Sequence, residues 1–216
     1  MAWVTSSSRK AVAVAAVGLA LGGLLPEPAS AKVFLSQEEA LTLAFPEADR
    51  SEKQTHVLSP EQVERIQRRA RARLESKLVS VHSGWRGEVL LGYAFIDVHR
   101  VRTQAEALLV VLGPAGELRS VRVLAFHEPL DYLPSDRWYG QFEGKPSDDA
   151  FRVGHDVHGI MGATLSARAT ADAVRRSLAF YEVLVRGAQE PSVHDQPTIR
   201  KTDQEDRAER ETRKSE

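Results

Sequence analysis

The chain has 216 residues, and its 29 basic and 30 acidic side chains give a formal net charge of −1. This length fits one domain with flanking tails. The charge balance argues against a nucleic-acid binder that relies on neutralising phosphates. The sequence contains no cysteine, which excludes disulfides, thiolate metal sites, cysteine-ligated iron–sulfur clusters and c-type haem attachment. Any electron carrier in this chain would have to be held in another way.

Residues 1–31 have the pattern of an export signal. Arg9 and Lys10 precede an apolar run over residues 11–25, which suits a signal peptide and is shorter than the roughly 20 residues that span a bilayer. Small residues then give a cleavage pattern that ends at Ala31. We predict a cleaved signal peptide and an exported, periplasmic or envelope-associated protein. The alternative is an uncleaved N-terminal anchor.

Residues 32–83 are predicted to form an N-terminal helical part. Ser36 and Glu39 make a capping box, so a helix should run from there to about Phe45. Residues 49–54 are polar and predict a loop or an exposed strand edge.

A second helix start lies at Ser59, where Pro60 takes the first helical position and Gln62 completes a capping box. The predicted apolar stripe of this helix is Val63, Ile66, Ala70, Leu74 and Leu78. The other face carries Arg65, Arg68, Arg69, Arg71 and Arg73. Interleaved Glu64 and Glu75 favour a solvated face over contact with an acidic membrane surface or partner.

Three strands are predicted next along the chain. Their residues are rich in β-favouring and apolar side chains, over 92–98, 106–112 and 118–124. The middle run is almost continuously apolar, which predicts burial on both faces, and Ser120 breaks the alternation of the third run as a bulge would. Short connections favour an antiparallel sheet flanked by helices, an α+β fold.

A glycine-bearing loop then meets a long helix. Apolar positions at Val174, Leu178, Tyr181 and Val185 follow helical spacing, with Gly187 as the predicted stop. Thr164 therefore falls at or just before the first helical turn, where free N–H groups and the helix dipole favour an anion such as phosphate. The alternative is that Thr164 or Ser166 is an ordinary N-cap.

The residues from Met161 to Ser166, Met-Gly-Ala-Thr-Leu-Ser, resemble the Ser/Thr-Gly-Ala-Thr-x-Ser/Thr signature of FMN-binding domain proteins. These include the C-type subunit of the sodium-pumping NADH:quinone reductase, the G-type subunit of Rnf complexes and the flavin domain of nitrous-oxide-reductase regulators. In that family the threonine hydroxyl carries FMN through a phosphoester, installed outside the cytoplasm by a flavin transferase that uses FAD and magnesium. The matching residue here is Thr164. The family usually has Asp and Ser or Thr where this chain has His158 and Met161.

The resemblance extends over residues 84–187, from Gly-Tyr-Ala-Phe-Ile-Asp at 92–97 through the following strands, and implies an FMN-binding domain-like fold. It also implies which residues hold the flavin. Phosphate would be held by the signature itself and by the arginine that follows, namely Gly162, Ala163, Thr164, Leu165, Ser166 and Arg168. The isoalloxazine pocket would be formed by Glu128, Tyr132 and Trp138. For Trp138 the alternative is plain core packing.

Two further segments complete the sequence predictions. His155 and His158 are placed as one side of a metal site would be, but no third ligand is evident, so a surface loop is the preferred interpretation. Residues 188–216 have dense mixed charge and almost no apolar content, which predicts a disordered tail.

The favoured hypothesis is an exported electron-transfer flavoprotein rather than a stand-alone catalyst. It would carry covalent FMN and relay electrons between membrane-bound or haem-bearing partners. The alternative is a non-flavinylated adaptor of an envelope complex, which His158 and Met161 favour. A freestanding flavin reductase ranks last, because the sequence has no glycine fingerprint for a nicotinamide nucleotide.

Overall fold

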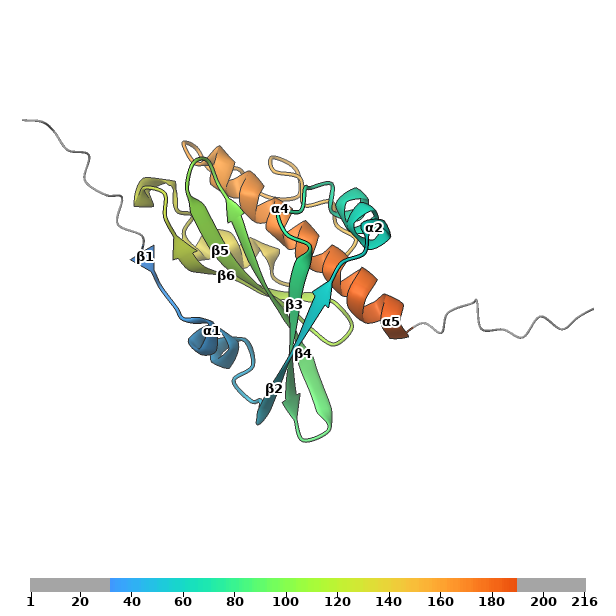
Figure 1. Ribbon diagram of the computed structural model, residues 1–216. Coiled ribbons are helices and arrows are strands. Elements are labelled where there is room, and N and C mark those ends of the chain that lie inside the picture. The colour runs from blue at the N-terminus through green and yellow to red at the C-terminus, as the bar shows by residue number, and fades with distance from the viewer. Residues whose placement is uncertain (1–31, 190–216) are drawn as a thin grey trace, which may run out of the picture.

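The computed structural model describes residues 32–189, which form one antiparallel sheet with helices on both faces (Figure 1). The strand order across the sheet is β1-β6-β5-β4-β3-β2. The strands are β1 (Lys32–Val33), β2 (Arg50–Val57), β3 (Leu78–Arg86), β4 (Val89–Arg100), β5 (Ala105–Leu112) and β6 (Leu118–Phe126). The helical elements are α1 (Gln37–Ala44), α2 (Pro60–Ala70), η1 (Leu130–Tyr132), α3 (Asp136–Tyr139), η2 (Gly140–Phe142), α4 (Thr164–Phe180), η3 (Tyr181–Arg186) and α5 (Gly187–Gln189). This arrangement confirms the α+β class.

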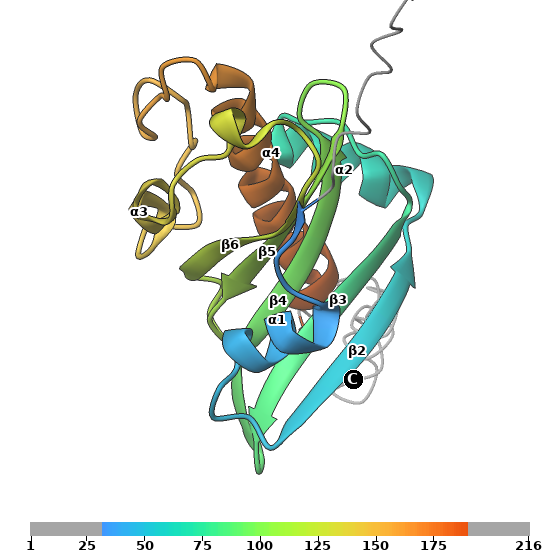
Figure 2. The same ribbon diagram turned by 90° about the vertical axis from the view of Figure 1, so that its left-hand side faces the viewer.

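The core consists of two apolar layers, one on each face of the sheet, because successive side chains of a strand point to opposite faces. In β5, Leu108 and Val110 join the larger layer, which packs against α2 and α4. Leu109 and Val111 join the smaller layer under α1. Figure 2 shows α1 crossing the face of the sheet opposite α4. The predicted burial of the middle strand on both faces is confirmed.

Helix α2 begins as predicted and ends earlier than predicted. Ser59 and Gln62 form the capping box. The helix stops at Ala70, because Arg71 adopts a left-handed backbone conformation with φ 51°. The predicted stripe was therefore wrong beyond this point: Leu74 lies outside the helix and Leu78 begins β3.

The segment predicted as a helical part supplies two long strands of the sheet. Residues 50–57, which are polar except for Val57, form β2 at the edge of the sheet, which confirms the strand-edge alternative given for 49–54. β2 pairs with β3 along its full length, and the predicted division at residue 83 falls inside β3. Residues 32–83 and 84–187 therefore share one sheet.

Strands β4 to β6 contain the three predicted strands, with longer bounds. A bulge occurs beside Ser120: Val111 pairs with Ser120 and Leu112 pairs with Leu118, which leaves Arg119 as the extra residue. Helix α4 begins at Thr164, as predicted. Gly187 does not stop the helical run, because the chain continues through the π-helical turn η3 into α5 with Gly187 at φ −66°.

Two predicted segments lie outside the described residues: the signal peptide at 1–31 and the tail from residue 190 onward. Within residues 32–189, every helix is too short or too polar to cross a bilayer.

Candidate functional site

A cavity of about 260 Å³ opens at the start of helix α4. Three segments that are far apart in the sequence form its walls. They are the β4–β5 connection, the segment after β6 and the helix start, which contribute Val101, Arg102, Glu128, Tyr132, Gly162, Ala163, Thr164, Leu165 and Ser166. Seven of the nine residues predicted to bind cofactor thus line one cavity.

The start of α4 carries no side-chain cap. The N-cap residue is Ala163, which has no side chain able to accept a hydrogen bond. Ser166 is not a cap either, because its hydroxyl donates to the carbonyl oxygen of Tyr132 at 2.6 Å. The N-cap alternative for both hydroxyl residues is therefore wrong.

Thr164 is exposed at this helix start. Within residues 32–189 its hydroxyl makes no hydrogen bond. The backbone N–H groups of Thr164, Leu165 and Ser166 also have no acceptor in the described part of the chain. Gly162, at φ +82°, has nothing within 4 Å of the position of a Cβ. The helix start therefore presents a free hydroxyl, free N–H donors and the positive end of a dipole to one open space.

Glu128 organises the wall opposite the helix. Its Oε1 accepts hydrogen bonds from the backbone N–H groups of Arg102, Thr103 and Gln104 at 3.2, 2.6 and 2.8 Å. Burial alone would raise the pKa of Glu128, but these hydrogen bonds hold that pKa below its usual value. The carboxylate is therefore an anchor for the β4–β5 connection, and it places Arg102 in the wall of the cavity.

Apolar side chains surround the opening. Tyr132 and Leu165 line the cavity and are 37% and 48% exposed, and neighbouring Met161 is fully exposed. Leu130, in the same helical turn as Tyr132, is also exposed. Unpaired apolar groups at a cavity mouth are typical of a ligand site or a contact surface.

Trp138 and Arg168 are the two predicted site residues that do not line the cavity. The indole N–H of Trp138 donates to the carbonyl oxygen of His158 at 2.8 Å, and its ring packs edge-on against Phe142. Gln141 accepts a hydrogen bond from the His158 N–H at 2.6 Å. The Trp138–Phe142 segment thus fastens the loop that precedes α4. Arg168 is exposed one turn into the helix.

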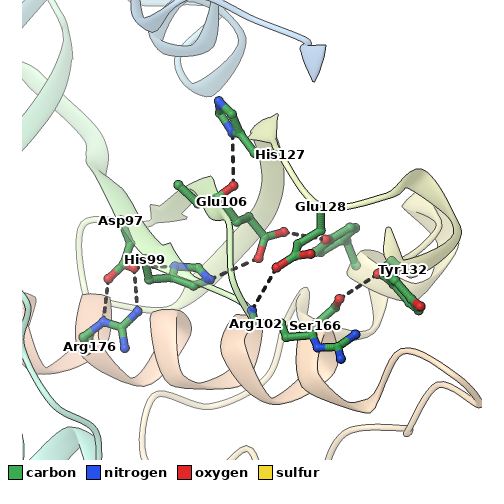
Figure 3. A network of polar contacts seen from close by, with 11 residues as sticks. Asp97, His99, Arg102, Glu106, His127, Glu128, Tyr132, Ser166 and Arg176 are labelled. Atoms are coloured by element: carbon green, nitrogen blue, oxygen red, sulfur yellow. Dashed lines mark hydrogen bonds and ion pairs between the residues drawn. The ribbon is translucent and has the colours of Figure 1, made fainter. Parts of the chain in front are cut away.

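A buried chain of polar side chains lies between α4 and the sheet, and it was not predicted from the sequence (Figure 3). Arg176 donates two hydrogen bonds to Asp97, at 2.7 and 2.6 Å. His99 contacts Asp97 at 2.8 Å and Glu106 at 3.0 Å. Tyr139 completes the chain with its hydroxyl 3.3 Å from Glu106. All five side chains are buried.

The pKa values of these buried side chains are set by their hydrogen-bond partners. Burial would lower the pKa of His99, but hydrogen bonds to Asp97 and Glu106 raise that pKa to about 9. Burial would raise the pKa of Asp97, but hydrogen bonds from Arg176 and His99 lower it to about 2. At neutral pH the Asp97 carboxylate therefore lies between two cations, the guanidinium of Arg176 and the imidazolium of His99, which compensates the cost of burying these charges.

Comparison with protein-family models and with curated proteins gives no match for this chain. Among the described residues, no group of three or more His, Asp or Glu side chains is arranged so that it could hold a metal ion, and this includes the segment with His155 and His158.

Proposed function

We propose that the protein is an exported electron-transfer flavoprotein that carries FMN as a phosphoester on Thr164. The observation that carries this proposal is the free Thr164 hydroxyl beside three unpaired N–H groups, at the mouth of a cavity of about 260 Å³. A flavin phosphate at this point would meet hydrogen-bond donors and the positive end of the helix dipole. The motif resemblance and the FMN-binding domain-like fold that it implies are part of the same proposal.

The residues at the site suit the parts of a flavin nucleotide. Thr164 would anchor the phosphate, the N–H groups of Leu165 and Ser166 would bond its oxygens, and Arg102 offers a nearby cation. Tyr132 and Leu165 supply apolar surface for the ring. Bound FMN supplies the redox chemistry, and the protein supplies position and electrostatics. Because the hydroxyl is consumed by the linkage, Thr164 takes no part in acid–base chemistry.

The proposed partners follow from this role. A flavin transferase that uses FAD and magnesium would install the group after export. Membrane-bound or haem-bearing proteins would then exchange electrons with it. The exposed apolar side chains around the cavity, Leu130, Tyr132, Met161 and Leu165, offer a surface where such a partner can approach the flavin.

Coexpression with a flavin transferase tests the proposal directly. We expect flavin fluorescence to remain with the denatured polypeptide on a gel, and Thr164→Val to abolish it. Thr42→Val is the matched control, because Thr42 is another exposed threonine on a helix, far from the cavity in sequence. The proposal fails if the wild-type band carries no flavin while a known acceptor is labelled in the same cells.

A non-flavinylated adaptor of an envelope complex is the second candidate. It is favoured by His158 and Met161, which stand where the family signature has a carboxylate and a hydroxyl, and both are exposed here. A colourless native protein that still copurifies with an envelope complex would support it.

A further inference from the structure

A second cavity, of about 360 Å³, lies where α2, the segment at 148–150 and the end of α4 with η3 meet. Arg175 sits eleven residues after Thr164, which is about 16 Å along the helix, so this is a separate site. Five arginines line it: Arg65, Arg68, Arg69, Arg71 and Arg175. Three carboxylates, those of Asp148, Asp149 and Glu182, also line the cavity.

Some of these arginines already have partners. Arg69 pairs with Glu182 at 2.7 Å. Arg68 pairs with Glu64 at 2.8 Å. Arg175 pairs with Asp172. These three guanidinium groups therefore have their charge compensated within the protein.

Arg65 and Arg71 are different. Neither has a carboxylate within ion-pair distance among residues 32–189. Burial lowers the pKa of Arg175, and Arg71 lowers it further against the opposing effect of Asp172. Arg71 therefore adds repulsion to a cationic cluster, and a bound anion would relieve it.

Two residues beside this cavity have unusual backbone conformations. Arg71 and Phe151 are the non-glycine residues with positive φ in the described part of the chain, at 51° and 48°. Arg175 donates a hydrogen bond to the carbonyl oxygen of Ala70, the residue before Arg71, at 2.8 Å, and another to the carbonyl oxygen of Phe151 at 3.0 Å. The guanidinium of Arg175 thus fixes the end of α2 against the 150–151 segment, and Arg71 is held at the cavity by the same contact.

We propose that this arginine cavity binds a ligand through a phosphate group. Arg65 and Arg71, the two lining guanidinium groups without an ion-pair partner among residues 32–189, can both bind a phosphate ester, which carries roughly −1.5 to −2 at neutral pH. Guanidinium groups bind phosphate oxygens in a bidentate fork. The volume is in the range of small-molecule sites. The phosphate can belong to a free small molecule or to a lipid headgroup.

Calorimetric titration of the full chain with inorganic pyrophosphate, at constant ionic strength, tests the site. We expect saturable binding with one ligand per chain. Arg65→Gln with Arg71→Gln should weaken it about tenfold for each guanidinium removed. The control pair, Arg122→Gln with Arg137→Gln, removes the same charge from exposed arginines outside this cavity and should leave binding unchanged.

Cosedimentation with lipid vesicles identifies the source of the phosphate group. Phosphatidylcholine vesicles with and without phosphatidylglycerol are sedimented with the same three proteins: the wild type and the two double variants. Pyrophosphate binding without sedimentation indicates a free phosphate compound. Sedimentation that requires phosphatidylglycerol, and that is lost only in the Arg65 and Arg71 variant, indicates a headgroup. Equal losses in the two variant pairs, or no binding of either probe, overturn the proposal.

Discussion

Glu128 shows how a single side chain builds the cavity at the start of α4. Its Oε1 receives three backbone N–H groups and the Thr103 hydroxyl. Glu128→Gln keeps the size but removes the charge, and hydrogen bonds to charged groups are worth about 1.5–3 kcal/mol each. We expect a loss of about 1–3 kcal/mol in the free energy of unfolding at pH 7, measured by urea denaturation.

The pH dependence separates this effect from a general defect. Because the pKa of Glu128 is lowered in the folded state, its stabilisation is present above the unfolded pKa of roughly 4.3 and is lost as pH falls through the folded pKa. The difference between wild type and Glu128→Gln should therefore shrink at pH 3. Glu88→Gln, at an exposed turn residue, is the control. A difference that stays constant from pH 7 to pH 3 would contradict the charge argument.

At the level of residues, the sequence predicts those site residues that are neighbours along the chain. Gly162 to Ser166 lie on one helix start, so their common placement follows from a short motif. Arg102 was missed because its position depends on Glu128, 26 residues later, which captures the backbone of the β4–β5 connection. Trp138 does not line this cavity, because its indole N–H bonds the loop before α4; an aromatic residue in a motif can serve the loop behind a site as well as the site itself.

At the level of elements, Gly116 and Tyr181 join the β5–β6 turn to the π-helical turn after α4. Gly116 has φ +87°, and a Cβ there would lie 2.3 Å from the Tyr181 ring. The Tyr181 hydroxyl donates to the carbonyl oxygen of Pro114 at 3.0 Å. Gly116→Ala should therefore destabilise by about 2–4 kcal/mol, from backbone strain plus displacement of the ring.

Gly87 offers a matched control for this prediction. It also has positive φ, +57°, but nothing lies within 4 Å of its Cβ position. Gly87→Ala should cost only the backbone strain, about 1–2 kcal/mol. Denaturant unfolding gives both values, and near-ultraviolet circular dichroism reports the Tyr93–Tyr181 ring pair. Equal destabilisation by the two variants would show that the ring contact contributes nothing.

The elements that the sequence predicts well are those with local signals. Capping boxes placed the starts of α1 and α2, and apolar runs placed β4 to β6. The end of α2 was wrong because Arg175, more than a hundred residues later, bonds the Ala70 carbonyl. β2 was left open between loop and edge strand because its residues are polar and its identity depends on pairing with β3.

At the level of the whole molecule, the buried chain from Arg176 to Tyr139 joins α4, β4, β5 and α3. In the sequence, these buried polar side chains are indicated by the positions that they occupy along the strand. Asp97 and His99 follow Phe95 at alternate positions of one strand, so they face the same core layer. Polar residues at core-facing positions require partners, but which partners they find is decided by tertiary packing.

Within these buried polar side chains, His99 makes the stability of the fold depend on pH in the alkaline range. The pKa of His99 is raised from 6.5 to about 9 in the folded state. Its stabilisation is therefore complete below the unfolded pKa near 6.5 and is lost as pH rises through 9. The total is on the order of 3 kcal/mol, because each unit of pKa shift corresponds to about 1.4 kcal/mol.

Unfolding by urea between pH 6 and pH 10 measures this loss. Wild type should lose stability steadily between pH 6.5 and pH 9, the interval between the unfolded and the folded pKa of His99. His99→Gln should be less stable at pH 6 and nearly flat over the same interval, because glutamine bears no proton that is lost there. His56→Gln, a half-buried histidine on the edge strand β2, should keep the wild-type slope. If His99→Gln retains that slope as well, the protonated imidazole of His99 is not the source of the loss of stability at alkaline pH.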